Sequence, residues 1–275
     1  MGKLVIFAAI LSAPVLAKTY TVDGIVVAVD PAARTMLVSH RAIGHYMPAM
    51  LMPFQAENAA ELAALHPGAR IAFELTVTKA GSVARNIRPT GAPDAELPPP
   101  AEKLSIGSVL PDFALIDQQG RTLRSSDIRG KVVAIDFIYT RCPLPDVCPR
   151  LSANFAMLQR QFRDQLGESL LLLTVTVNPE FDTPPVLAEY ARRWTAGMGW
   201  RFLTGDVAKL AASLGEIYWS EEGSIGHNST TSIIGRDGRL AAQVEGSSYR
   251  PDQLVHLITR QMLAQPIARQ QEDQP

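Results

Sequence analysis

The sequence predicts a chain of two domains, a small all-β barrel followed by an α/β domain. Residues 18–90 carry about five short segments with the alternation of apolar and polar side chains that is typical of half-buried strands. Residues 91–103 form a proline-rich linker, since five of the residues from Gly91 to Pro100 are glycine or proline. Over residues 104–265, continuous apolar runs alternate with amphipathic helical patterns, which indicates a sheet covered by helices, and residues 266–275 are a polar tail.

Length and charge limit the classes of function that the chain can serve. Its 275 residues suffice for two domains with their own cores, and a formal net charge of −1 gives no reason to expect nucleic-acid binding. Residues 1–17 have the features of a signal peptide, with Lys3, an apolar run from Leu4 to Leu16 and a small-residue cleavage site ending at Ala17. The run is too short for a comfortable membrane-spanning helix. We therefore expect an exported, periplasmic protein, with anchoring by an uncleaved signal as the less favoured alternative.

The first domain is expected to be a closed barrel of OB type, because about five short strands fall within roughly seventy residues. Its clearest strand is the alternating stretch from Ile71 to Val77. An earlier strand places Met36, Val38 and His40 on one face by simple alternation. Gly24, within the first strand, is expected to mark a bulge or bend.

A cluster of methionines follows the histidine strand. Met47, Met50 and Met52 fall within six residues, and Met50 and Met52 point to the same side if the segment is extended. Thioether sulfur is soft and neutral and imidazole is borderline, so together with His40 they suit Cu(I) far better than hard cations. A single methionine is better explained as flexible core filler. The cluster, bracketed by a histidine on the previous strand, favours the metal interpretation.

This segment resembles the CusF family of periplasmic copper carriers over roughly residues 20 to 88. The family binds Cu(I) with one histidine, two methionines and, in CusF itself, a tryptophan ring over the metal. The resemblance implies that His40, Met50 and Met52 are copper ligands. It also aligns Met47 with the tryptophan, so that a third thioether would take the place of the ring.

The second domain is organised around its two cysteines, Cys142 and Cys148. They follow an almost continuous apolar run, residues 132–139, which predicts a buried central strand. Pro149 then stands at a natural first helical position, ahead of an amphipathic pattern. The thiols therefore lie between a strand end and a helix start, where the helix dipole favours thiolate, the form that attacks substrates and binds metals.

Cysteine count alone favours a structural disulfide in an exported protein. A bridge that closes so short a loop removes little chain entropy, however, so the placement favours chemistry over stability. The motif Thr140–Pro143 followed by Asp146–Pro149 resembles the Sco/SenC family, thioredoxin-fold copper chaperones whose usual motif is T-x-C-P-x-x-C-P. That family has three residues between its cysteines, whereas this sequence has five, as though Leu144-Pro145 had been inserted.

The Sco/SenC resemblance spans most of residues 105 to 263 and implies an α/β thioredoxin-like domain, so the predicted fold is this domain preceded by the small all-β barrel of OB type. In the family, a histidine just before a late strand completes the copper site. Carried over to this chain it is His227, where the usual D-H-S is replaced by Gly226–Ser229. The resemblance thus implies Cys142, Cys148 and His227 as ligands, a set that suits Cu(I) and can also accept Cu(II).

Two soft-metal sites on one exported chain favour a copper-binding metallochaperone that carries Cu(I) and delivers it by ligand exchange. By resemblance to Sco/SenC, the recipient is the copper centre of a respiratory oxidase, cytochrome c oxidase. A thiol reductant is a further expected partner, because free thiols in an oxidising compartment need one.

Two alternatives remain open. In the first, the protein is a thiol–disulfide reductase acting on the cysteines of a copper protein, with Cys142 attacking and Cys148 resolving. The long cysteine spacing and the lack of proline over residues 228–233 argue against it. In the second, the protein only buffers copper and has no dedicated recipient.

Overall fold

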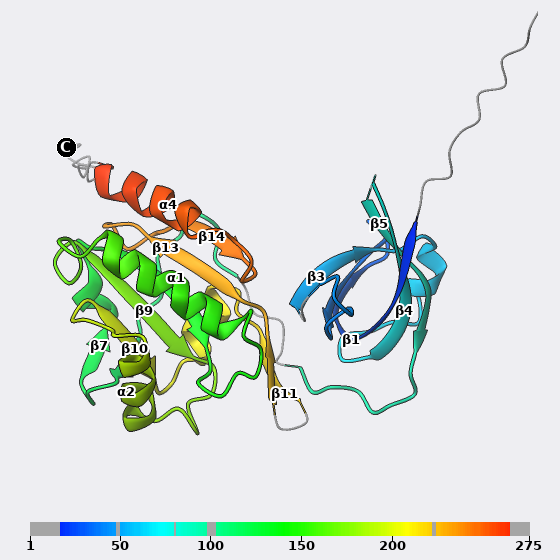
Figure 1. Cartoon of the computed structure of the whole chain (residues 1–275), viewed down its shortest axis with the longest axis horizontal. Coiled ribbons are helices and arrows are strands. Elements are labelled where there is room, and N and C mark those ends of the chain that lie inside the picture. The colour runs from blue at the N-terminus through cyan, green and yellow to red at the C-terminus, as the bar shows by residue number, and fades with distance from the viewer. Residues whose placement is uncertain (1–16, 48–49, 80, 98–102, 222–223, 265–275) are drawn as a thin grey trace, which may run out of the picture. The chain divides into compact units, whose positions relative to one another are not determined.

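The computed structural model describes residues 17–47, 50–79, 81–97, 103–221 and 224–264 (Figure 1). The signal peptide expected over residues 1–17 lies outside this part of the chain except for Ala17, as do the tail and residues 98–102 of the expected linker. The chain folds as two compact units that divide between Pro93 and Asp94. Within the residues described, none of the helices has the length and apolar character needed to span a bilayer.

The first unit is one five-stranded sheet in the order β3-β2-β1-β4-β5, whose paired strands β1–β2, β1–β4 and β4–β5 are antiparallel. The chain leaving β3 forms a parallel bridge from Ala56 to Ala84 of β5, which links the two outer strands as in a closed barrel. The OB-type prediction is confirmed. The elements are β1 (Lys18–Asp30), β2 (Thr35–His40), β3 (Met50–Gln55), the short helix η1 (Ala59–Leu62), β4 (Arg70–Thr78) and β5 (Gly81–Pro89).

Alternate residues of these strands face inward and form the apolar core of the first unit, which includes Met36, Val38, Phe54 and Phe73. The prediction of a bulge at Gly24 is wrong, because the irregularity in the β1–β2 pairing lies between Val26 and Ala28.

The second unit is a seven-stranded mixed sheet in the order β14-β13-β8-β9-β10-β6-β7. Strands β8, β9 and β10 are parallel, and β13 runs antiparallel to β8. Every residue of β8 and β9 is buried, as the apolar runs predicted. The elements are β6 (Ala114–Asp117), β7 (Thr122–Arg124), η2 (Ser125–Ile128), β8 (Val132–Ile138), α1 (Cys148–Gln161), β9 (Leu170–Thr176), α2 (Pro184–Arg193), β10 (Trp200–Thr204), α3 (Ala208–Ser213), β11 (Tyr218–Glu221), β12 (Ser224–His227), β13 (Thr230–Ile234), β14 (Leu240–Glu245) and α4 (Pro251–Leu263).

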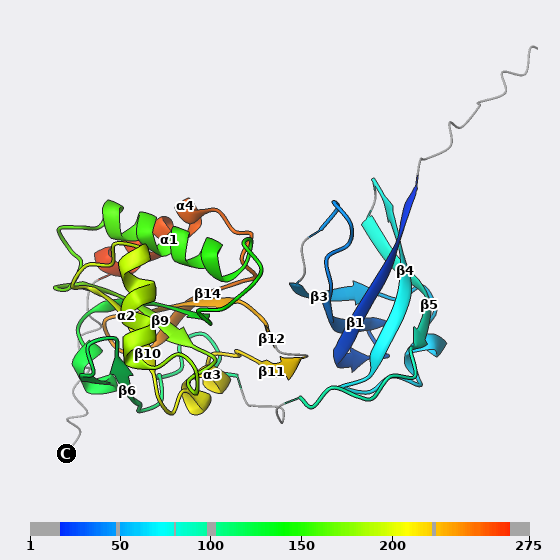
Figure 2. The same cartoon turned by 60° about the horizontal axis from the view of Figure 1, so that its bottom comes forward.

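Helices α1 and α4 pack against each other over β8, on one face of this sheet (Figures 1 and 2). Helix α2 lies against α1, since the hydroxyls of Ser152 and Tyr190 are hydrogen-bonded at 3.0 Å in the interior. These helices give β8 and β9 the apolar cover that a buried parallel pair requires. The predicted α/β class of the second domain is confirmed.

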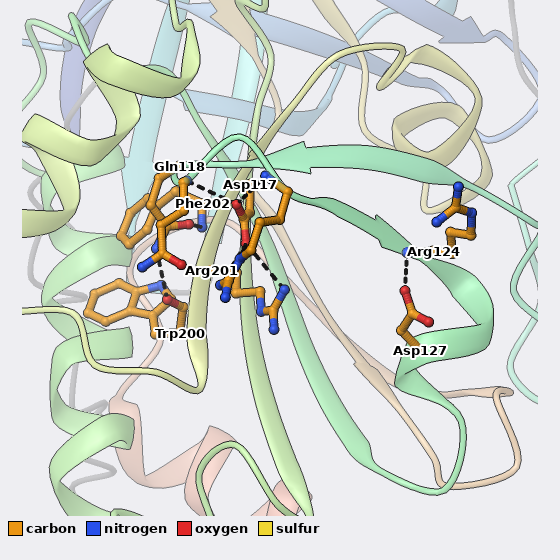
Figure 3. Close-up of polar contacts among 9 residues, drawn as sticks. Asp117, Gln118, Arg124, Asp127, Trp200, Arg201 and Phe202 are labelled. Carbon is orange, nitrogen blue, oxygen red and sulfur yellow. Dashed lines mark hydrogen bonds and ion pairs between the residues drawn. The ribbon is translucent and has the colours of Figure 1, made fainter.

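A buried carboxylate joins the β6–β7 hairpin to β10 (Figure 3). Asp117 accepts hydrogen bonds from the backbone N–H of Gln119 and Arg121, and its Oδ2 lies 3.0 and 3.2 Å from the guanidinium groups of Arg121 and Arg201. Burial alone would raise the pKa of Asp117, but these hydrogen bonds and charges outweigh burial and lower it. The hairpin is thereby fixed as the outer edge of the sheet.

The topology brings three loops to one edge of the second sheet. Parallel β8 and β9 end at the same edge, and antiparallel β13 begins there. The loop after β8 carries the cysteines, the loop after β9 runs to α2, and His227 ends β12 just before β13. Residues far apart in the sequence therefore meet beside the thiols.

Candidate metal centres

The five-residue cysteine spacing is accommodated by a turn. The backbone N–H of Val147 donates to the carbonyl of Leu144 at 3.1 Å, which returns the chain to the start of α1. The N–H of Cys142 donates to Tyr139 at 3.2 Å, and the Ser247 hydroxyl donates to the carbonyl of Asp146 at 2.7 Å. The extra residues therefore form an ordered turn between the two thiols, and both cysteines carry free thiols.

Cys148 and His227, 79 residues apart in sequence, lie side by side. The Cys148 sulfur is 3.6 Å from Nε2 of His227, and both side chains are almost fully buried. Metal–sulfur and metal–nitrogen bonds of roughly 2.3 and 2.0 Å place two ligands of one tetrahedral or trigonal ion about 3.5–3.7 Å apart. The observed separation fits that requirement.

The hydrogen bonds of His227 determine which ring nitrogen is free. Nδ1 lies 2.7 Å from a carboxylate oxygen of Glu216 and 3.2 Å from the carbonyl oxygen of Asn228. Both neighbours are acceptors, so Nδ1 carries the proton. In the neutral ring, Nε2 then keeps its lone pair and directs it at the Cys148 sulfur, which is the state of a metal-ligating imidazole.

The two thiols differ in acidity because Cys142 accepts a hydrogen bond from Cys148 and because Cys148 is the more deeply buried. A hydrogen bond from Cys148, helped by the nearby charge of His227, lowers the pKa of Cys142 to about 6 despite partial burial. Burial raises the pKa of the Cys148 thiol, and the negative charge of Cys142 and the buried Asp136 raise it further. At neutral pH the pair therefore holds a Cys142 thiolate beside a Cys148 thiol.

His227 and Glu216 perturb one another in the interior. Burial would lower the pKa of His227, but the hydrogen bond and charge of Glu216 outweigh burial and raise it. Burial raises the pKa of Glu216 to about 7, against the opposing effect of His227. The two side chains form a buried hydrogen-bonded pair, and the other nitrogen of the His227 ring contacts the Cys148 sulfur.

Two further buried carboxylates lie in this sheet and its loops. Asp136 lies at the middle of β8 with no exposed surface, and burial raises its pKa to about 8. Asp182, in the loop after β9, accepts hydrogen bonds from the Thr140 backbone N–H at 3.0 Å, the Thr140 hydroxyl, and the Thr176 hydroxyl at 2.5 Å. Asp182 thus ties Thr140, which lies just after β8 and two residues before Cys142, to the end of β9.

The first unit holds its own candidate ligand, His40 at the end of β2. Its side chain is buried, Nδ1 lies 2.7 Å from the carbonyl oxygen of Arg41, and Nε2 has no hydrogen-bond partner in the described part of the chain. Burial lowers the pKa of His40, so the ring is neutral. A buried nitrogen with a free lone pair costs free energy unless something binds it, and a metal ion satisfies it.

Gly24 allows β2 to approach β1 at this point. A Cβ atom on Gly24 would lie 2.5 Å from Val38, 2.6 Å from the Ser39 carbonyl oxygen and 3.1 Å from the Cα of His40. The first two contacts are closer than real side chains tolerate, and the third is tight. The glycine therefore serves close packing beside His40, which explains its place in the strand.

The methionines lie on the neighbouring strand and its approach. Met50 and Met52 belong to β3, which adjoins β2 in the sheet, and Met47 precedes it in a tight loop closed by a bridge to Ile43. Met47 and Met52 pack partly buried against the apolar core that contains Phe54. The Phe54 ring in turn stands edge-on to the His40 ring, with centroids 5.4 Å apart.

The Cys142, Cys148 and His227 donors do not form a complete metal site among the residues that the structure describes. Across the residues that the structure describes, no group of three or more His, Cys, Asp or Glu side chains is arranged to hold a metal ion. The donors at hand are the soft ones: the Cys148–His227 pair with the acidic Cys142 thiol, and His40 with thioethers on the adjacent strand. Soft sulfur with imidazole selects copper over hard cations.

Sequence reasoning missed Glu216 and Asp136. Glu216 contacts His227 from eleven residues upstream, and no local pattern announces it. Asp136 did leave a signal, because a charged residue inside a fully apolar strand is rare unless it has a role.

Comparisons with known proteins agree with this arrangement. The family model described as SCO1/SenC matches residues 102–263, and that of the copper binding periplasmic protein CusF matches residues 19–89. A SCO1 protein homolog of Bacillus subtilis is 26% identical over 147 residues, covering 50% of this chain and 75% of the relative.

Solved structures match the second unit. A SCO1/SenC family lipoprotein of Bacillus anthracis is 25% identical, covers 56% of this chain and 95% of its own, and has a TM-score of 0.51. Yeast Sco1 with copper bound is 23% identical, covers 62% of this chain and 96% of its own, and has a TM-score of 0.50. The latter shows the fold alone. The thioredoxin-like prediction is confirmed.

Proposed function

This chain belongs to the SCO1/SenC family, and from that membership we propose that it is a periplasmic copper chaperone that carries Cu(I) and delivers it by ligand exchange. The observation that carries the proposal is the state of two histidines. In His40 and His227 alike, Nδ1 is held by an oxygen acceptor, so in the neutral ring Nε2 is the nitrogen that offers a lone pair, in a buried position. Each histidine shares its domain with sulfur side chains on a neighbouring segment, and imidazole with sulfur suits soft ions such as Cu(I) better than hard cations.

The donor sets of the two domains differ in charge, and this difference determines the direction in which Cu(I) is transferred between them. The set of His40, Met47, Met50 and Met52 is neutral, whereas the set of Cys142, Cys148 and His227 gains negative charge as its thiols ionise. Thiolates hold Cu(I) more tightly than thioethers do, so the ion passes from the first domain to the second. The linker keeps the second site at a high effective concentration. Domains on separate chains should load the second site more slowly at dilute concentration, and an equal rate would refute transfer within the chain.

The recipient we propose is the copper centre of a respiratory oxidase, cytochrome c oxidase. An acidic Cys142 thiol beside Cys148 readily forms a disulfide in the periplasm. A thiol reductant must therefore keep both thiols reduced so that they can bind the metal. The Cu(I) ion is cargo, bound by the chain and passed on.

A gene deletion tests delivery against storage. If the protein delivers copper, the deletion lowers oxidase activity in low-copper medium, and the parent gene restores it while the Cys142→Ser/Cys148→Ser variant does not. Added copper should also restore it. Normal oxidase activity with growth defects only at high copper would instead support copper buffering.

One observation favours a second candidate, a thiol–disulfide reductase. The pKa of Cys142 is lowered to about 6 beside a protonated Cys148, which is the arrangement of an attacking thiolate and a resolving thiol. Reduction of a disulfide-bonded copper-site peptide by the metal-free protein measures this activity. The Cys148→Ser variant should then accumulate the mixed disulfide through Cys142.

A further inference from the structure

The segment before β11 forms a cradle around the His227 segment. Asn228 accepts a hydrogen bond from the Ile217 backbone N–H at 2.6 Å and donates from its amide to the Gly215 carbonyl at 2.7 Å. The backbone N–H of Asn228 donates to the Ile217 carbonyl at 3.1 Å. Residues 215–217 and 227–230 are therefore locked together by bonds on both sides of Glu216.

Glu216 lies at the centre of this cradle with no exposed side-chain surface. One carboxylate oxygen accepts from Nδ1 of His227 at 2.7 Å, and the other accepts from the backbone N–H of Thr230 at 3.1 Å. The hydrogen bond from Thr230 therefore fixes the orientation of the Glu216 carboxylate, and the hydrogen bond to Nδ1 fixes the orientation of the His227 ring. Gly226 stands directly before His227, where the usual D-H-S motif has an aspartate. A side chain cannot be accommodated there, because a Cβ atom on Gly226 would lie 2.5 Å from the Trp219 ring.

We propose that Glu216 is a positioning residue that raises the affinity of the Cys142, Cys148 and His227 site for Cu(II) relative to its affinity for Cu(I). The inference rests on the proposed function only in taking copper as the ion. A carboxylate hydrogen-bonded to Nδ1–H strengthens the donor at Nε2 and adds negative charge to a buried site. Negative charge stabilises a doubly charged ion more than a singly charged one, and low surrounding polarity enlarges the difference.

The Glu216→Gln variant tests the proposal, with Glu189→Gln on the exposed face of α2 as the matched control. An amide can satisfy the Thr230 N–H through its oxygen, but it then turns an NH₂ group toward Nδ1. We expect the ratio of Cu(II) to Cu(I) affinity, each measured by chelator competition, to fall roughly tenfold or more in Glu216→Gln. The control should stay within about twofold of the parent, well inside that effect.

A second measurement needs no metal. Nitrogen-15 NMR of the metal-free protein, at a pH high enough for the His227 ring to be neutral, reports which ring nitrogen is protonated. The parent should show protonated Nδ1, and Glu216→Gln should show that population reduced or reversed. If Glu216→Gln does not fold, Glu216→Asp carries the test, since it keeps the charge but withdraws it by one methylene and should give an intermediate ratio.

The outcomes separate the two claims. An unchanged affinity ratio together with an unchanged His227 tautomer in Glu216→Gln would overturn the positioning role. A parent that binds no copper at Cys142 and Cys148 would overturn the proposed function, while the NMR comparison would still decide whether Glu216 fixes the imidazole.

Discussion

Replacing Asp136 with asparagine should stabilise the metal-free protein, increasingly so as pH rises. Asp136 is buried at the centre of β8, and burial raises the pKa of its carboxyl to about 8 from an ordinary 3.8. Between these values the folded state keeps a proton that the unfolded state has released. The free energy of unfolding therefore falls as pH rises through this window, and the stabilising contribution is complete only below the unfolded pKa.

The magnitude follows from the width of the window. Each pH unit inside it removes about 1.4 kcal/mol of stability from the parent through Asp136, a loss that is absent from Asp136→Asn because the amide has no proton to lose. Between pH 5 and pH 7.5 the difference in unfolding free energy between variant and parent should grow by about 3 kcal/mol. Urea unfolding of the reduced proteins at both pH values measures it, with Asp164→Asn as an exposed control.

The variant also links this residue to the thiols, because the charge of Asp136 contributes to the raised pKa of Cys148. Asp136→Asn should lower that pKa and speed alkylation of Cys148 above about pH 8, where Asp136 of the parent is ionised. A free-energy difference that does not change with pH would refute the buried-acid explanation of this site.

Three further outcomes are expected. Asp182→Asn should cost about 2–3 kcal/mol in urea unfolding, because the buried donors of Thr140 and Thr176 lose acceptors, and a loss under about 0.5 kcal/mol would contradict the bridging role. The alkylation rate of Cys142 should rise through a midpoint near pH 6, since its lowered pKa gives thiolate above that value, whereas a midpoint near pH 9 would show an ordinary thiol. His40→Leu should leave metal-free stability within about 1 kcal/mol, because loss of the Nδ1 bond to the Arg41 carbonyl is offset by removal of the unpaired, buried Nε2. It should abolish the rise in Tm that Cu(I) gives the first domain, and a retained rise would exclude His40 as a ligand.

The elements of both domains could be predicted from local patterns. The apolar run over residues 132–139 predicted β8, because a strand buried on both faces is apolar throughout. The alternation from Ile71 to Val77 predicted β4, because a strand buried on one face has an apolar residue at every second position. The placement of Gly24 could not be predicted in the same way. Its small size serves the approach of β2, and that contact depends on a strand pairing across sixteen residues.

Some residues of the candidate site could likewise be predicted from local sequence motifs, and others could not. Cys142, Cys148 and His227 were proposed from motifs, and the structure places Cys148 beside His227 through the sheet topology. Glu216 could not be found, because it reaches His227 only through the pairing of two segments whose contact is not encoded in either one. The turn that accommodates the long cysteine spacing likewise depends on contacts such as that between Asp146 and Ser247, 101 residues apart.

The most direct test of copper handling is an anaerobic Cu(I) titration of the reduced protein, residues 18–275, against a competing chelator. It should be run beside Cys142→Ser/Cys148→Ser and Met50→Leu/Met52→Leu double variants. Two equivalents bound by the parent, with one lost in each double variant, are the result that two separate copper sites predict. A single equivalent that survives the cysteine changes would contradict a metal site in the thioredoxin-like domain, and the redox role of Cys142 and Cys148 would take its place.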